Sequence, residues 1–389
     1  MRPLRLIAAV TTSPRLLGAR PYALAAPGRI APDSLSGAGG TAPAPDRPPT
    51  RARLRAWAEL LRVSALFTVP GDALAGAAAA GRRPGRGTAL AVGASLCLYE
   101  AGMALNDWAD REEDAVDRPH RPIPSGRVAP GAALAAAGVL TAAGLALAAR
   151  AGRPALAVAS GLAATVWAYD LRLKHTKLGP AAMASARALD LMLGATASKE
   201  PAVSAGGSTA RRIGPGTGTR TRTGTRTRTG TRTRTGGRPA TAHAASAVLP
   251  AALALGAHTY AVTAVSRHEA PGGSTAAPLA ALAGVAGIGA AVLRGRPLPG
   301  KPPGTPAAVE RLLLPAFAAA YLRTSAIPLL HAGLNPSPPL TQRAVGGGIR
   351  AMIPLQAALA ARAGAPLNGL AVMALVPLAR KLARKVSPT

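Results

Sequence analysis

Apolar runs of roughly 18 to 25 residues, rich in Ala, Leu, Val and Gly, recur along the chain and limit its fold more than any other feature. An α-helix of that length crosses the hydrocarbon core of a bilayer, which is about 30 Å thick. Ten runs qualify, near residues 60–80, 87–106, 128–150, 153–171, 179–198, 243–265, 275–294, 308–331, 342–362 and 366–384. The sequence therefore predicts an all-α, polytopic membrane protein.

The strongly basic composition, with a formal net charge of +30, is at first sight typical of a nucleic-acid-binding protein. However, two low-complexity segments, residues 1–50 and 199–240, together carry +13 of that charge. The remaining surplus is spread between the apolar runs. We therefore expect the chain to lie in a lipid bilayer and to have no specific nucleic-acid partner. The single cysteine, Cys97, excludes an intrachain disulfide and a CxxC metal site.

The same low-complexity segments define the domain organisation. We expect residues 1–50 to be a disordered N-terminal extension and residues 51–389 to form one membrane domain. That domain is interrupted at residues 199–242, where Gly-Thr-Arg-Thr-Arg-Thr repeats have no apolar periodicity and cannot form a packed core. This segment is predicted to be a disordered insertion. The alternative is that its arginines bind acidic lipid or nucleic acid without specificity.

Acidic residues are concentrated in one short segment. The chain has only 16 of them, and six lie between Asp107 and Asp117. At 100° per residue, the side chains of Asn106, Asp107, Asp110, Asp114 and Asp117 share an arc of about 100° on one helix face. Like charges at the end of an apolar helix repel one another unless a cation lies among them. The pattern predicts a bound cation, and a solvated acidic face paired with neighbouring arginines is the alternative.

The side-chain chemistry indicates which cation is bound. Ligands with oxygen atoms only favour Mg²⁺, a hard cation that keeps several waters and is shared with substrate phosphates. The segment that follows contains three prolines, which end the helix and place Arg118 and Arg121 beside the acidic residues. Arginine next to Mg²⁺ suggests that the substrate is a diphosphate.

The stretch NDWADREEDAVDRPHRPIPSGRV, residues 106–128, resembles the first aspartate-rich motif of the UbiA superfamily of intramembrane prenyltransferases. In that motif NDxxDxxxD is followed by RPxRPIPSG. The resemblance implies a bundle of about nine transmembrane helices in the cell membrane, with a central cavity that is open to lipid. It also implies that Asn106, Asp107, Asp110 and Asp114 hold Mg²⁺ against a prenyl diphosphate, with the three aspartates as catalytic residues. The aspartate-rich loop would face the cytoplasm.

A second segment is similar to the same family. The sequence YDLRLKHT, residues 169–176, is similar to the YSxxLK segment that follows the family's fourth span. The resemblance implies that Tyr169 and Lys174 lie in a cap over the pocket, where Lys174 contacts the diphosphate. Asp72 stands where family members contact the acceptor or the diphosphate. Arg118 and Arg121 belong to the same expected substrate-binding set.

The chain departs from the family pattern after the sixth span. Most members carry a second aspartate-rich motif there, whereas this chain has Arg267, His268 and Glu269. The segment resembles a bacterial branch of the superfamily that includes EboC-like proteins and carries Arg-x-Glu at this place. Either one Mg²⁺ together with Arg267 and Glu269 is sufficient for the diphosphate, or its ionisation is impaired. A charged helix end outside the site is the remaining interpretation.

Ionisable side chains inside the apolar runs are further candidates, because they are costly in a membrane and usually face a cavity or a partner. The set consists of Asp72, Glu100, Arg187, Asp190 and Arg323. Glu100 shares the face of the acidic segment and is expected to orient it. Arg187 and Asp190 are three residues apart and are placed either to pair with each other or to face the cavity.

These observations predict an enzyme that uses Mg²⁺ to transfer an isoprenoid chain from its diphosphate to a small or lipid acceptor. Cationic groups would stabilise the departing pyrophosphate, and an apolar pocket would exclude water from the allylic cation. A noncatalytic protein that binds or moves a prenyl-linked metabolite is the alternative, and the single Glu269 supports it. The DGxxAR motif of the CDP-alcohol phosphotransferases does not occur in the sequence.

Overall fold

The computed structural model describes residues 50–62, 67–197, 240–269, 273–294 and 307–386. Contacts divide the chain into residues 1–47, which lie outside the described part, and residues 48–389. Most of the predicted N-terminal extension and insertion thus lies outside the described residues. Two boundaries were wrong, because Thr50 begins the first helix and residues 240–242 already belong to another helix.

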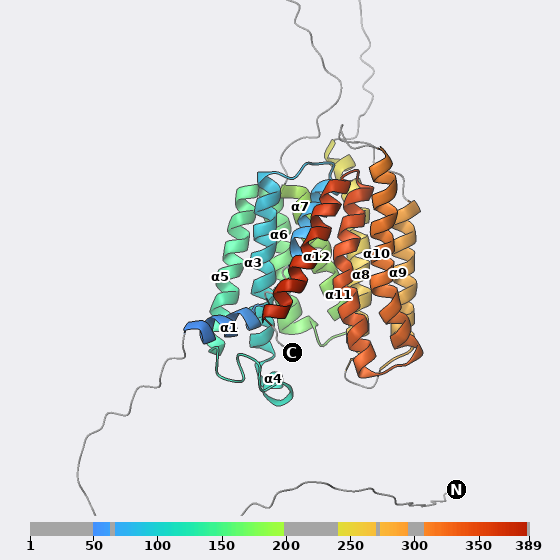
Figure 1. Ribbon diagram of the computed structural model, residues 1–389. Helices are drawn as coiled ribbons and strands as arrows, with labels where there is room; N and C mark the ends of the chain where they lie inside the picture. The colour runs from blue at the N-terminus through green and yellow to red at the C-terminus, as the bar shows by residue number, and fades with distance from the viewer. Residues whose placement is uncertain (1–49, 63–66, 198–239, 270–272, 295–306, 387–389) are drawn as a thin grey trace, which may run out of the picture. The chain divides into compact units, whose positions relative to one another are not determined.

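Every element of the described part is a helix (Figure 1). The order is α1 (Thr50–Leu60), α2 (Val69–Ala79), α3 (Arg86–Ala109), α4 (Arg111–Asp117), α5 (Pro130–Ala151), α6 (Arg153–Ala168), the π-helical turn η2 (Tyr169–Leu173), α7 (Gly179–Ala197), α8 (Ala240–Ser266), α9 (Ala276–Arg294), α10 (Ala307–Leu334), α11 (Pro338–Arg362) and α12 (Pro366–Val386). Among the described residues, six helices (α3, α5, α8, α9, α10 and α11) are long and apolar enough to cross a membrane. This confirms a multi-pass, all-α membrane protein, and the number of nine crossings stays a prediction.

The first predicted span, residues 60–80, does not form one helix. α1 ends at Leu60, and α2 begins at Val69 with Pro70 in its first turn, where proline is tolerated. Arg51, Arg53 and Arg55 of α1 are exposed. A helix with this much charge is more stable at the interface than in hydrocarbon. Accordingly, α1 lies across the end of the bundle near α4 (Figure 1).

Small residues bring α2 against α7 near the middle of the bundle. A Cβ atom at Gly76 would lie 1.9 Å from the carbonyl oxygen of Leu191, and one at Gly194 would lie 2.4 Å from the backbone of Ala73. Close backbone approach through small residues is a common way for membrane helices to pack. The contact places the polar residues of α2 beside those of α7.

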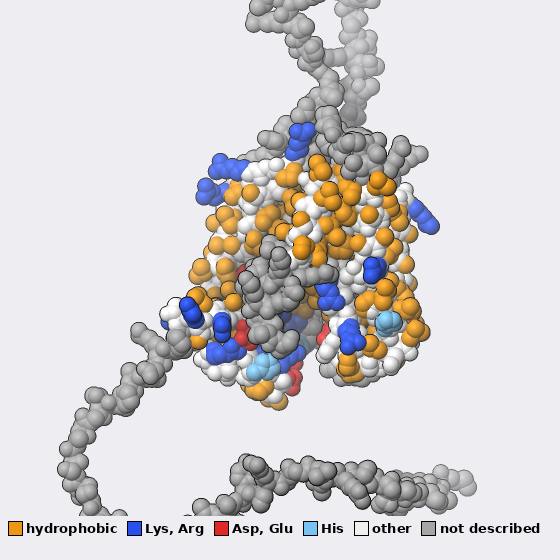
Figure 2. All heavy atoms as spheres, in the orientation of Figure 1, with side chains coloured by type: hydrophobic (Ala, Val, Ile, Leu, Met, Phe, Trp, Pro, Cys, Tyr) orange, Lys and Arg blue, Asp and Glu red, His pale blue; other side chains and the backbone are white. Residues whose placement is uncertain are grey.

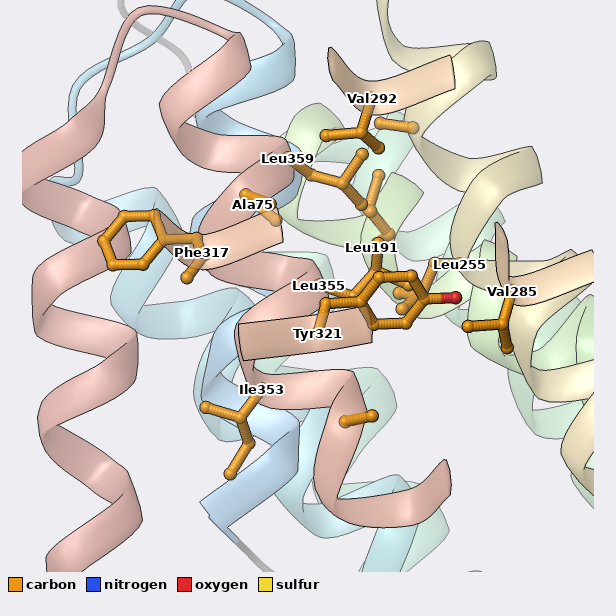
Figure 3. Close-up of a cluster of buried hydrophobic side chains, with 14 of the residues drawn as sticks. Ala75, Leu191, Leu255, Val285, Val292, Phe317, Tyr321, Ile353, Leu355 and Leu359 are labelled. Atoms are coloured by element: carbon orange, nitrogen blue, oxygen red, sulfur yellow. The ribbon is translucent and has the colours of Figure 1, made fainter. Parts of the chain in front are cut away.

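The core lies where α7, α8, α10 and α11 meet. Leu191, Leu255, Tyr321 and Leu355 are buried there and point toward one another (Figure 3). On the outside, hydrophobic side chains cover most of the visible flank of the bundle, and charged side chains gather mainly toward its ends (Figure 2). A belt of this kind is what a bilayer requires.

Candidate functional site

A cavity of about 550 Å³ opens inside the bundle. Its wall is mostly apolar and comes largely from α3, α7, α8 and α11. Polar side chains gather in two places, which we call the aspartate end and the inner polar wall. Arg62, Asn106, Tyr169 and Asp170 line the aspartate end, and Ser95, Tyr99, Arg187 and Asp190 form the inner polar wall. A mostly apolar pocket with a few convergent polar groups is typical of a ligand site.

The acidic segment spans the junction of α3 and α4. Asp110 lies between the two helices, but helical hydrogen bonds continue through it, from Asp110 N to Asn106 O at 2.9 Å and from Asp114 N to Asp110 O at 2.7 Å. The spacing therefore still places Asn106, Asp107, Asp110 and Asp114 on one side of the junction. Asp117, the last residue of the acidic segment, is exposed at the end of α4.

Two of the carboxylates are buried and share one arginine. Asp107 and Asp114 are only 4% and 3% exposed. The Nη1 atom of Arg121 lies 2.7 Å from Oδ2 of Asp114 and 3.4 Å from Oδ1 of Asp107. Arg62 Nη2 lies 3.2 Å from Asp107 Oδ1, and Arg118 Nη1 lies 3.5 Å from Asp114 Oδ1. Buried carboxylates need such partners, since an unpaired charge there is strongly destabilising.

The other two oxygen-bearing side chains of this set belong to Asn106 and Asp110, and Asp110 contacts the expected cap. Asn106 Nδ2 donates a hydrogen bond of 2.8 Å to Asp110 Oδ2, and the Lys174 ammonium donates to Asp110 Oδ1. The chain turns sharply after η2, and a Cβ atom at Gly179 would lie only 2.9 Å from the carbonyl oxygen of Lys174. The structure thus places Lys174 and Tyr169 beside the aspartate end, as expected. Their contact with a diphosphate stays a prediction.

Arg267 and Glu269, which stand in place of the missing second aspartate-rich motif, also lie near the aspartate end. The Arg267 guanidinium donates a hydrogen bond to the carbonyl oxygen of Thr176, which ties the end of α8 to the cap. Glu269 is half-buried. Burial raises the pKa of Glu269, and the positive charge of Arg118 opposes that shift. Glu269 therefore lies within electrostatic reach of Arg118, which itself contacts Asp114.

The donor atoms of the aspartate end suit Mg²⁺. Asn106, Asp107, Asp110 and Asp114 supply oxygen atoms on one side of the helix junction, and cationic side chains surround them. This combination fits a hard cation that is shared with an anionic ligand. A further group of potential ligand atoms, from Asp110, Glu113 and His175, lies within 4.8 Å of one another. The sequence analysis did not anticipate His175, because it has no motif spacing.

Sequence reasoning missed two other residues of this end. Arg62 follows α1 with a φ of 47°, in the left-handed region, and reaches Asp107 across 45 residues of sequence. Asp170 is buried in η2 and lines the cavity. The only available signal for Asp170 was its position in the segment YDLRLKHT, and Arg62 carried no signal beyond its charge.

The ionisable residues within the spans behave differently from one another. Arg187 does pair, but with Asp72 of α2 rather than with Asp190, which accepts a hydrogen bond from Ser95. Glu100 is 8% exposed, and neither of its oxygens has a hydrogen-bond partner among the described residues, so it does not hold the acidic segment by a hydrogen bond. Arg323 is exposed and does not line the cavity, so of the two expected surroundings, a cavity or a partner, the first is excluded.

Comparison with known proteins agrees with this arrangement. Residues 65–293, more than half of the chain, match the model of the UbiA prenyltransferase family. A digeranylgeranylglyceryl phosphate synthase from Methanopyrus kandleri is 37% identical over 130 residues, which cover 32% of this chain and 46% of that relative. The aligned part of the chain spans at most about half the length of the curated relatives it matches.

Two solved structures share the fold. One is the apo structure of a UbiA homologue from Aeropyrum pernix K1, 17% identical, with a TM-score of 0.51 over 76% of this chain and 96% of that one. The other is a UbiA homologue from Archaeoglobus fulgidus bound to GPP and Mg²⁺, 16% identical, with a TM-score of 0.51 over 82% of this chain and 99% of that one. The expected helical architecture is confirmed.

Proposed function

Because this chain belongs to the UbiA prenyltransferase family, we propose that it transfers an isoprenoid from a prenyl diphosphate to an acceptor within the membrane. The observation that carries the proposal is the set of oxygen ligands at the aspartate end, which faces cationic side chains at one end of an apolar cavity. The complex of the Archaeoglobus fulgidus homologue with GPP and Mg²⁺ supports the choice of donor and cofactor.

In this proposal Asn106, Asp107, Asp110 and Asp114 would hold Mg²⁺, which when bound would neutralise the negative charge of the departing pyrophosphate. Lys174 and Arg121, which now contact the carboxylates, exchange those contacts for phosphate oxygens when the diphosphate binds. This exchange would free the carboxylates of Asp110 and Asp114 to bind Mg²⁺.

The remaining predicted residues have supporting roles in the same proposal. Tyr169 lines the cavity and covers the reacting carbon. Arg118 and Arg267 add positive charge near the diphosphate, while Glu269 is the single carboxylate left at the second motif. Apolar side chains such as Leu98, Leu162 and Val166 exclude water from the allylic cation. The prenyl tail remains in the bilayer.

The test uses the full chain in lipid nanodiscs with radiolabelled prenyl diphosphates of several lengths and a lipid extract as acceptor source. We expect pyrophosphate release that needs Mg²⁺ and that falls at least 100-fold in Asp110→Asn. Asp117→Asn, an exposed change at the end of the same acidic segment, is the matched control and should release pyrophosphate like the wild type. Mg²⁺-dependent binding without release at any chain length would instead favour a noncatalytic carrier.

We further propose that the aspartate end faces the cytoplasm. In a Cys97→Ser background, Val116→Cys in exposed α4 should react with an impermeant maleimide only from the cytoplasmic side. Arg83→Cys, in the connection between α2 and α3, should react only from the opposite side. Labelling of Val116→Cys from outside intact cells would reverse the orientation.

A further inference from the structure

The cap brings one more carboxylate to the aspartate end. Asp170 lies in the π-helical turn η2, between Tyr169 and Lys174, and its side chain lines the cavity. Single π-helical turns are uncommon and often occur at functional sites. In the described part of the chain, the three aspartates proposed to hold Mg²⁺ do not line the cavity. Asp170 is therefore the aspartate of this end that faces the cavity directly.

The position of the Asp170 carboxylate depends on Gly102 of α3. A Cβ atom at Gly102 would lie 3.9 Å from Asp170 Oδ2 and 3.0 Å from Val166 Cγ1, so the carboxylate lies against α3. Gly102 precedes Asn106 by four residues and Asp110 by eight, which places all three on one helix face. The Asp170 carboxylate therefore lies beside the face that carries the proposed Mg²⁺ ligands, about one turn deeper in the bundle.

The Asp170 carboxylate is buried without a partner. Asp170 is 5% exposed, and no described residue donates a hydrogen bond to its carboxylate or forms an ion pair with it within 4.0 Å. The three aspartates proposed to hold Mg²⁺, by contrast, each contact an arginine or lysine. The charges of Lys174 and Arg62 reach Asp170, but those of Asp110 and Asp107 oppose them. Asp170 thus lacks the compensation that a buried carboxylate needs.

Burial accordingly raises the pKa of Asp170 to about 7, and the charge of Lys174 opposes that shift. The turn η2 belongs to the cap and not to the six helices that are long and apolar enough to cross a membrane. Near neutral pH the Asp170 carboxyl group is therefore protonated in about half of the molecules. A bound cation would stabilise the ionised form and displace that proton, because a carboxyl group must be deprotonated to bind a metal.

The end of α8 does not supply a carboxylate at this place. The Arg267 guanidinium bonds to the carbonyl oxygen of Thr176 in the cap, and Glu269 lies within electrostatic reach of Arg118. In the described part of the chain, neither Arg267 nor Glu269 lines the cavity. The cavity side of the aspartate end therefore receives its carboxylate from η2.

We propose that Asp170 is a further Mg²⁺ ligand and that it holds a second cation on the cavity side of the aspartate end, shared with the diphosphate. This inference rests on the proposed prenyl transfer. One Mg²⁺ in a protein is usually bound by one or two carboxylates together with substrate phosphates and waters, so four aspartates exceed what a single ion takes. Two cations would neutralise more of the charge on the departing pyrophosphate than one.

The first test counts bound cations, with Mn²⁺ in place of Mg²⁺. The full chain in nanodiscs of zwitterionic lipid is titrated with Mn²⁺ at pH 8 in the presence of pyrophosphate, and free Mn²⁺ is measured by electron paramagnetic resonance. We expect the wild type to bind two Mn²⁺ per chain and Asp170→Asn to bind one. Glu112→Gln, which removes an equal charge from an exposed position of α4, is the matched control and should bind two.

The second test measures the affinity for pyrophosphate with and without Mg²⁺. With Mg²⁺, Asp170→Asn should weaken pyrophosphate binding at least tenfold. Without Mg²⁺, the same change should leave the binding unchanged or tighten it, because it removes a negative charge that repels the anion. A residue that only supports the fold would shift both affinities in the same direction.

Asp170→Ser, which leaves a small polar side chain, is the second variant and should behave like Asp170→Asn in both tests. If neither variant folds, the wild-type count decides, since two Mn²⁺ per chain support the inference and one overturns it. Two Mn²⁺ bound to Asp170→Asn, or equal shifts of its pyrophosphate affinity with and without Mg²⁺, would also overturn it.

Both tests measure binding without an acceptor and without turnover, so they are separate from the test of the proposed function. Two bound cations without prenyl transfer to any acceptor would contradict the proposed function alone. Prenyl transfer by a wild-type chain that binds a single cation would contradict only the role of Asp170.

Discussion

At the scale of single residues, the aspartate end depends on cations that neutralise buried carboxylates. Asp107 and Asp114 are almost completely buried and are seven residues apart, so they would repel each other without Arg121 between them. Arg121 therefore stabilises the fold before any substrate is present. The same guanidinium is available to a diphosphate, because one side chain can exchange carboxylate for phosphate oxygens.

Arg121→Gln should lower the free energy of unfolding by about 2 kcal/mol, because it leaves two buried carboxylates with less compensation. Adding Asp114→Asn should recover at least about 1 kcal/mol, since one of those charges is then removed. Thermal unfolding in nanodiscs measures both values. Arg127→Gln breaks the half-exposed pair with Glu59 and the exposed hydrogen bonds to Ser125 and His120, and it should change stability by less than about 1 kcal/mol. Equal losses in Arg121→Gln and Arg127→Gln would contradict the bridging role.

Lys174→Met should reduce kcat/KM for the prenyl diphosphate about 10- to 100-fold, because a hydrogen bond to a charged group contributes about 1.5–3 kcal/mol. Lys174→Arg should retain more activity than Lys174→Met. The matched control is Lys177→Met, an exposed lysine in the same connection, for which steady-state kinetics should match the wild type. A similar loss in both methionine variants would indicate general attraction of the diphosphate rather than a specific contact.

At the scale of elements, the packing of α2 against α7 decides what lines the inner polar wall. Gly76 and Gly194 allow the two backbones to touch, and Asp72 then reaches Arg187 across 115 residues of sequence. Because Arg187 pairs with Asp72, it does not form an ion pair with Asp190, its neighbour on the same helix. Local spacing alone was equally compatible with a pair between Arg187 and Asp190.

Gly194→Val should therefore disturb both stability and the inner polar wall. Its side chain would overlap the backbone of Ala73, and overpacking of this kind costs about 1–3 kcal/mol or more. We expect a lower thermal unfolding temperature, while Gly138→Ala, whose Cβ meets no atom within 4 Å, should be neutral or stabilising. Wild-type stability in Gly194→Val would show that α2 and α7 can separate without cost.

At the scale of the whole molecule, one cavity has two polar regions. Positive side chains surround the aspartate end, whereas at the inner polar wall Arg187 pairs with Asp72 and Ser95 donates a hydrogen bond to Asp190. Both ends include residues of α3, which is joined by η2 at the aspartate end and by α7 at the inner polar wall.

Deleting residues 205–238 should leave membrane insertion and pyrophosphate release unchanged, because the repeat sequence has no apolar periodicity with which to pack. Fractionation of cell membranes and the release assay measure the two properties. Replacing the repeat with a Gly/Ser linker of equal length separates an effect of the arginines from an effect of length. Loss of activity in both variants would assign a function to the insertion.

The sequence by itself determined the class of protein and the acidic segment. Long apolar runs can satisfy their backbone in lipid only as helices, and residues spaced three, four or seven apart share a helix face whatever the tertiary structure. Asn106, Asp107, Asp110 and Asp114 follow from that local geometry. The orientation of α1 across the bundle did not, because hydropathy does not show where a helix breaks.

Only the tertiary structure decided which distant residues meet. Arg62 reaches Asp107, Lys174 reaches Asp110 and Arg187 reaches Asp72 across 45, 64 and 115 residues. Such pairs depend on which small residues allow two helices to touch and on the angle at which they pack, and many arrangements share the same apolar pattern. The aspartate end could therefore be recognised from the sequence, whereas its arginine from the α1–α2 connection and the ion pair of Arg187 with Asp72 required the packed helices.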